Sequence, residues 1–153
     1  MSNNLCESCG VVTKLTKETE KRDSDAVFAG NANIQAALTY QIEQVMKRAW
    51  LLLEDKEWNN AEAHFNSALS LDAEHAHAYI GLLCVDLKLQ EEGALSQYNK
   101  PIDDHKLFKK GLRFANDEYR NILERYSESI KESIKRRQEE KKKELKQHLA
   151  EKK

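Results

Sequence analysis

Apolar residues recur every three or four positions through the middle of the chain, the pattern of amphipathic helices. The first stripe runs from Ile34 to about Asp55. Asn59 and Glu62 have the spacing of a capping box, which predicts that a second helix opens just after Trp58. Its buried face would be Ala61, Phe65, Ala68, Leu69 and Leu71.

Two further helices are predicted downstream. Asp72 can cap a third helix, whose apolar face is Ala76, Tyr79, Leu82, Leu83 and Leu87. Residues 90–104 hold Gly93 and the single proline, so they predict a loop with a short helical turn at 91–98. Asp103 or Asp104 would then cap one last helix, with the apolar face Phe108, Leu112, Ala115, Tyr119, Ile122, Leu123 and Tyr126.

Both ends of the chain lack this pattern. Residues 1–33 have no sustained periodicity and contain Cys6 and Cys9 followed by the polar, charged run Thr13 to Asp25, which predicts a cysteine knuckle followed by a poorly ordered linker. Residues 135–153 hold nine Lys/Arg and four Glu, which predicts a charged helical tail of coiled-coil-like composition. The expected organisation is therefore all-α: knuckle and linker (1–33), helical domain (34–134) and tail (135–153).

Charge is divided unevenly along the chain. Residues 1–110 carry a balance of -5 and residues 111–153 a balance of +4, within a net charge of -1. A basic end can contact nucleic acid, but the interleaved glutamates and the lack of aromatic residues there make nucleic acid an unlikely partner and favour a solvated helix. The odd number of cysteines, with no secretion signal and no apolar run of transmembrane length, predicts a cytoplasmic location.

The stretch Ile42 to His75 resembles one tetratricopeptide repeat, carried by the string AWLLLEDKEWNNAEAHFNSALSLDAEHAHAY. In that repeat small residues lie where two antiparallel helices touch, and Ala49 and Ala61 occupy such positions. Arg48 and Ala73 depart from the pattern. The resemblance implies a helical hairpin, to which a third helix and the long C-terminal helix are added, and it implies partner binding without catalytic activity.

The N-terminal string CESCG also resembles the start of a zinc ribbon, as found before such a hairpin in a group of small bacterial proteins. Cys6 and Cys9 could supply two of the four thiolates that a structural zinc site needs. The pair could be half of a ribbon completed outside this chain, an intersubunit site, or an inert remnant. Cys84 lies among apolar residues and is predicted to be a buried structural thiol.

No arrangement of residues typical of an enzyme is present: the glycines never cluster into a phosphate-binding loop. We therefore expect a non-catalytic interaction or adaptor module that binds an unidentified protein through the hairpin surface. Its candidate anchors are the aromatic residues Trp50, Trp58, Tyr79 and Phe108, each of which could instead fill the core. A homodimer could cover an end of the helical stack, and the alternative function is nucleic-acid association through the knuckle and the basic helix.

Overall fold

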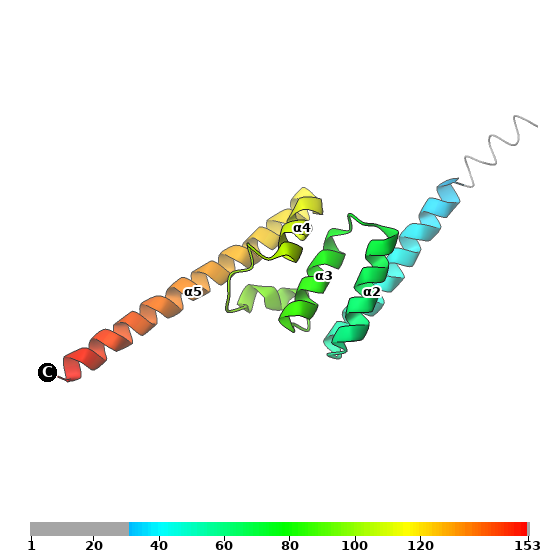
Figure 1. Cartoon of the computed structure of the whole chain (residues 1–153). Coiled ribbons are helices and arrows are strands. Elements are labelled where there is room, and N and C mark those ends of the chain that lie inside the picture. Colours follow the sequence, from blue (N-terminus) through cyan, green and yellow to red (C-terminus); the bar gives the residue numbers. More distant parts are fainter. Residues whose placement is uncertain (1–30, 153) are drawn as a thin grey trace, which may run out of the picture. The chain divides into compact units, whose positions relative to one another are not determined.

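A computed structural model describes residues 31–152, and it is helical with no strand in that range (Figure 1). The chain divides into two units, Met1–Gln41 and Ile42–Lys153. In the first unit, described residues 31–41 are helical. Helix therefore begins at least three residues before the predicted start at Ile34. Ile34 and Tyr40 are 67% and 64% exposed in this segment.

The second unit is built from antiparallel helices. Residues 42–54 are helical and are followed by α2 (Trp58–Leu71) and α3 (Ala76–Leu87). A 3-10 helix, η1 (Glu92–Gln97), precedes α4 (Lys106–Phe114) and the long α5 (Asp117–Glu151). The predicted all-α class and the predicted turn within 91–98 are confirmed. No helix in the described range is both long and apolar enough to cross a membrane.

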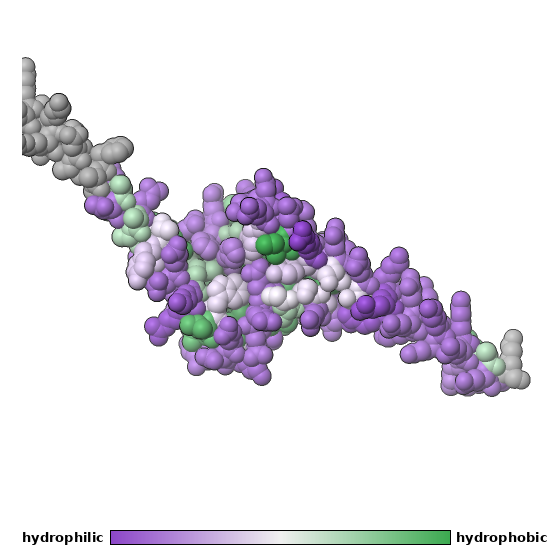
Figure 2. Space-filling view, turned by 180° about the vertical axis from the view of Figure 1, so that it is seen from behind, coloured by the Kyte–Doolittle hydropathy of each residue, from purple (hydrophilic) through white to green (hydrophobic). Residues whose placement is uncertain are grey.

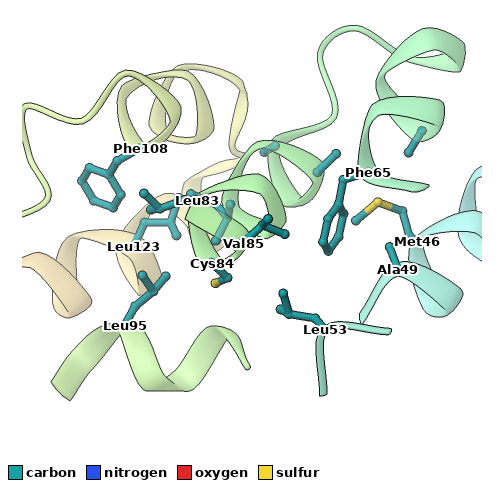
Figure 3. Packing of buried hydrophobic residues seen from close by; sticks show 14 of the residues in the cluster. Met46, Ala49, Leu53, Phe65, Leu83, Cys84, Val85, Leu95, Phe108 and Leu123 are labelled. Carbon is teal, nitrogen blue, oxygen red and sulfur yellow. The ribbon is translucent and has the colours of Figure 1, made fainter. Parts of the chain in front are cut away.

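Small residues allow the first helices to pack closely, as predicted. Ala49, Ala61 and Ala68 are fully buried, and Phe65 fills the space that they leave. Its ring meets the Trp50 ring edge-on, with centroids 5.0 Å apart and an angle of 76° between planes. Figure 3 shows Phe65 with Met46 and Ala49 to one side and α3 to the other.

Helix α3 is the centre of the core and is buried on more than one face. Besides the predicted Ala76 and Leu83, it buries Ala78, Ile80, Gly81, Cys84 and Val85. It packs against α2, α4 and η1, so its buried residues lie on several faces of the helix and do not form a single stripe. Gly81 permits the approach to α2, because a Cβ at this position would lie 2.2 Å from Cε1 of Phe65.

Three of the predicted helix caps are wrong. Helix α2 begins at Trp58 with Glu57 as its N-cap residue, so Asn59 lies inside the helix. His75 caps α3 in place of Asp72 by accepting a hydrogen bond from the amide of Ala78. His105 likewise caps α4 through the amide of Leu107. Imidazole Nδ1 takes the acceptor role more usually played by a carboxylate.

The single last helix that the sequence predicted is two helices, broken at Ala115 and Asn116. Asn116 has extended backbone angles, and its side chain accepts a hydrogen bond from the amide of Tyr119 at 2.8 Å, which makes it the N-cap of α5. The side chain of Arg120 donates to the carbonyls of Leu112 and Ala115 at the end of α4. The predicted apolar face is therefore divided between two helices, and Ile122 is exposed on α5.

Helix α5 is held by the segment between α3 and α4. Leu95 of η1 and Ile102 are buried beneath it. Asp103 accepts a hydrogen bond from the Ser127 hydroxyl and forms an ion pair with Lys131, 3.2 Å from Oδ2 to Nζ. These contacts replace the capping role predicted for Asp103. From residue 135 to 152 every residue is exposed, and Figure 2 shows hydrophilic side chains along this part of α5.

Candidate functional site

A groove bounded by α2, α3 and α4 is a concavity of the second unit that could receive a partner. We call it the α2–α3–α4 groove, and its volume is about 420 Å³. This is within the range of about 300–1,000 Å³ that ligand pockets occupy. It is lined by Glu62, Asn66, Leu82, Val85, Asp86, Lys88, His105, Lys106, Leu107 and Lys110.

Helical spacing explains which side chains reach this groove. Glu62 and Asn66 are four residues apart on α2, and Lys106 and Lys110 are four apart on α4, so each pair lies on one face of its helix. Leu82 and Val85 of α3 lie between these walls. His105, at the start of α4, bonds Asp86 near the end of α3, and Lys110, later in α4, lies over Tyr79, earlier in α3, so the two helices run antiparallel.

The floor of the groove is apolar and only partly covered. Leu82 and Leu107 are half-buried, while Val85 is 5% exposed and belongs to the core. Burial of apolar area stabilises a complex by roughly 25 cal/mol per Å² before the costs of association. A partner side chain seated on Leu82 and Leu107 would therefore gain binding free energy from this floor.

Lysines dominate the rim. Lys88, Lys106 and Lys110 are exposed, and no ion pair with a carboxylate is found for them among residues 31–152. Helix α4 as a whole contains four Lys/Arg and no Asp or Glu. Glu62 is the acidic residue on the opposite wall. The groove can therefore attract negative charge along the α4 side.

The pair formed by His105 and Asp86 is a structural contact. Nε2 of His105 lies 2.7 Å from Oδ2 of Asp86. Nδ1 accepts from the amide of Leu107 at 3.2 Å. A backbone amide can only donate, so the ring proton of the neutral imidazole is on Nε2 and points at Asp86. Both ring nitrogens are engaged, and neither is free to accept a proton from a substrate.

Two of the four predicted anchors lie next to lysines of the groove lining. Trp58 is half-buried, four residues before Glu62, and the Nζ of Lys88 lies 5.3 Å from its ring centroid. Tyr79 is also half-buried, and the Nζ of Lys110 lies 5.4 Å from its ring centroid. The Tyr79 ring also stacks on Phe114 with centroids 5.7 Å apart.

The other two anchors are placed differently. Trp50 is half-buried against Phe65. Phe108 is 1% exposed and packs in the core beside Leu83 and Leu123 (Figure 3). For Phe108 the core alternative therefore holds, because a buried ring cannot anchor a partner without unfolding.

Lys88 has a backbone conformation that lysine rarely adopts. Its φ of 58° is left-handed, as is the φ of 62° at Lys56, and both residues follow the end of a helix. Glycine is favoured at such positions because it lacks the Cβ that creates the strain. Both lysines line a smaller hollow around Trp58.

A second group of polar side chains lies inside the unit, away from the groove. Cys84 is fully buried, as predicted, and burial raises the pKa of its thiol to about 12. Burial also raises the pKa of Glu92, although interaction with the Tyr119 hydroxyl opposes that rise. Burial and the nearby Glu92 raise the pKa of Tyr119. The Tyr119 hydroxyl is buried and has no hydrogen-bond partner among residues 31–152.

The histidines serve separate local contacts. The His77 ring stacks on Tyr119 at 3.8 Å between centroids, and burial lowers its pKa. Nδ1 of His64 lies 2.8 Å from the carbonyl of Asn60. Within residues 31–152 no three His, Cys, Asp or Glu side chains are placed to hold a metal ion. Cys6 and Cys9, the predicted half-site for zinc, lie outside that range.

The sequence was compared with models of known protein families, with curated proteins and with solved structures, and no match was found. The groove itself is therefore the basis for a functional proposal.

Proposed function

We propose that this chain is a non-catalytic protein-interaction module that binds a partner in the α2–α3–α4 groove. The observation that carries the proposal is the groove's construction, with a half-buried apolar floor between walls from α2 and α4. The half-buried aromatic residues Trp58 and Tyr79 lie next to two lysines of its lining, Lys88 and Lys110. Aromatic residues around an apolar centre are the usual source of binding energy in protein interfaces. The engagement of both His105 nitrogens supports a binding role over a catalytic one.

We further propose that the second unit is a tetratricopeptide-like assembly. Residues 42–54 with α2 would form one repeat, and α3 with α4 a second one in which η1 and its flanking loops extend the connection. The full burial of Ala49 and Ala61 at the expected small positions supports this relationship. The buried, free thiol of Cys84 supports the cytoplasmic location that we propose for the protein.

Affinity capture with two matched variants tests the proposed function. The full chain is immobilised as wild type, as Leu82→Asp in the groove floor, and as Leu145→Asp on the exposed part of α5. We expect wild type and Leu145→Asp to retain the same protein from a lysate, and Leu82→Asp to lose it. Circular dichroism checks that all three chains stay helical. Equal retention by all three, or retention of no protein, would refute binding in the groove.

The exposed part of α5 supports a second candidate, nucleic-acid association. Residues 135–146 contain seven Lys/Arg and three Glu and are exposed throughout. A contact between these residues and phosphates would release counterions, so the affinity would fall steeply with salt. Binding to a mixed-sequence RNA or DNA is measured with the full chain and with residues 135–153 removed. An affinity that is independent of salt, or unaffected by the deletion, would exclude this candidate.

A further inference from the structure

The shape of the α2–α3–α4 groove limits what can lie in it. The groove's lining on α3 and its C-cap runs from Leu82 to Lys88. At 1.5 Å per residue this span is about 9 Å, or a little under two helical turns. Helices on both sides form its walls, which is the arrangement that receives an amphipathic helix in helix-in-groove complexes.

The charges on the rim indicate the chemistry of that helix. Lys88, Lys106 and Lys110 are exposed without an ion-pair partner among the described residues. The carboxylate of Asp86 accepts a hydrogen bond from Nε2 of the neutral His105 ring and keeps its negative charge. Three cations therefore face two carboxylates of the lining, Glu62 and Asp86, with the cations at one end and along one wall. A basic partner would face these lysines, whereas an acidic partner would be drawn to them.

Lys88 has a left-handed backbone conformation at the end of α3, as Lys56, which does not line the groove, has after the preceding helix. A left-handed residue after a helix is under less strain as glycine. Strained residues that persist tend to occur at functional sites. Here the strained position holds a side chain that stands over Trp58 and lines the groove.

We propose that the ligand of this groove is an acidic amphipathic helix, supplied by a partner protein, of which about two turns lie in the groove. Two apolar side chains three or four residues apart would rest on Leu82 and Leu107, and flanking Asp or Glu side chains would meet Lys88, Lys106 and Lys110. This inference rests on the proposed function and specifies the class of partner.

Selection from a displayed library of helical peptides tests the inference without knowledge of the natural partner. The library contains 14-residue amphipathic helices with equal numbers of acidic, neutral and basic members, and the full chain is the bait. We expect the enriched peptides to be acidic and to share an apolar pair at three- or four-residue spacing. Enrichment of neutral or basic peptides, or of none, would overturn the proposed chemistry.

Charge reversal then locates the binding site of the strongest peptide. Lys106→Glu/Lys110→Glu should weaken its affinity at least tenfold, and Leu82→Asp should do the same. The control is Lys141→Glu/Lys142→Glu, which makes the same charge change on the exposed part of α5 and should alter the affinity less than twofold. An equal loss in the control, or tight binding by Leu82→Asp, would show that the contact is a general attraction between charges. All of the replaced lysines are exposed, so each lysine variant should remain folded, and circular dichroism checks that the half-buried site of Leu82→Asp tolerates the change.

The two proposals fail in different ways. If a lysate protein is captured through Leu82 but the enriched peptides are not acidic, the proposed function stands and the inferred chemistry is wrong. If neither the lysate protein nor any peptide depends on Leu82, both are wrong. An oligonucleotide that binds through Lys106 and Lys110 but ignores Leu82→Asp would assign the lysines to a nucleic acid and overturn the inference.

Discussion

Replacing Gly81 with alanine should destabilise the fold, although the same change stabilises most helices. Gly81 is buried in the middle of α3. An added methyl group would lie 2.2, 2.3 and 2.6 Å from three ring carbons of Phe65. Carbon atoms in favourable contact are about 3.5–4.0 Å apart, so the ring would have to retreat by more than about 1 Å. The Trp50 ring, 5.0 Å away between centroids, and the buried Ala49 restrict that movement.

The expected size of the effect follows from two opposing contributions. Alanine is favoured over glycine in a helix interior by about 1 kcal/mol. Overpacking a well-packed core costs about 1–3 kcal/mol. The simultaneous overlap with three ring atoms places Gly81→Ala at the upper end of that range. We therefore expect a net loss of about 2 kcal/mol, which corresponds to a fall in Tm of roughly 10 °C for a domain of this size.

Urea unfolding followed by circular dichroism measures this loss, with Gly93→Ala as the control. A Cβ at Gly93 meets nothing within 4 Å, and its φ is not positive, so this variant should be within about 0.5 kcal/mol of wild type. In a Phe65→Leu background, which lacks the ring, Gly81→Ala should cost at least 1 kcal/mol less. If Gly81→Ala is as stable as wild type, or if Phe65→Leu does not change its cost, the close packing of α2 on α3 is wrong.

Three further predictions concern polar groups. Burial raises the pKa of Glu92 above its usual 4.5, because the folded chain favours the neutral acid at this position. The free energy of unfolding therefore falls as the pH rises through that raised pKa. Glu92→Gln should therefore be more stable than wild type at pH 7–8 in urea titrations and equal to it near pH 4; a difference that does not change with pH would contradict this. The Ser127 hydrogen bond holds the pKa of Asp103 below its usual 3.8, so stability is present above that value and lost below it. Asp103→Asn should cost about 1 kcal/mol at pH 7, discounted for the partial exposure of Asp103, and this cost should shrink as the pH falls below 3.8. The Cys84 thiol, with its pKa raised to about 12, should resist iodoacetamide at pH 8 in the native chain and react on unfolding, as peptide mass spectrometry would show; rapid native labelling would mean that α3 opens locally.

The sequence predicted the first part of the second unit well because one physical signal determined it. Alanines within apolar stripes of three- and four-residue spacing predicted where residues 42–54 and α2 touch, and Ala49 and Ala61 are fully buried. Such close contact excludes larger residues, so the contact positions can be recognised in the sequence by their small residues. Cys84 was predictable for the same reason, because the residues around it are apolar.

The break between α4 and α5 was missed because the apolar repeat continues across it. Phe108, Ala115 and Tyr119 are all buried, so periodicity alone predicted one helix. A local signal was available: Asn116 precedes Asp117 and Glu118, an N-cap residue followed by acidic residues in a first turn. The caps formed by His75 and His105 had no such signal, because histidine is not among the residues favoured at this position.

The candidate site was predictable only in part. Trp58 and Tyr79 were recognised as aromatic residues near the hairpin, and both lie beside the α2–α3–α4 groove. The lysines could not be assigned to it, because α4 was not separated from α5. The left-handed backbone of Lys88 could not be predicted from the sequence either, since only the fold shows which residue follows the end of a helix.

The second half of α5 has a consequence for how this chain could change over evolutionary time. Past Ile134 the helix runs for about 25 Å without touching the core. Substitutions there alter no buried packing, so the stability of the fold places little constraint on the identity of residues 135–151. Any purifying selection on residues 135–151 would therefore act through their contacts with other molecules. A comparison of substitution rates on the two sides of Ile134 would detect it.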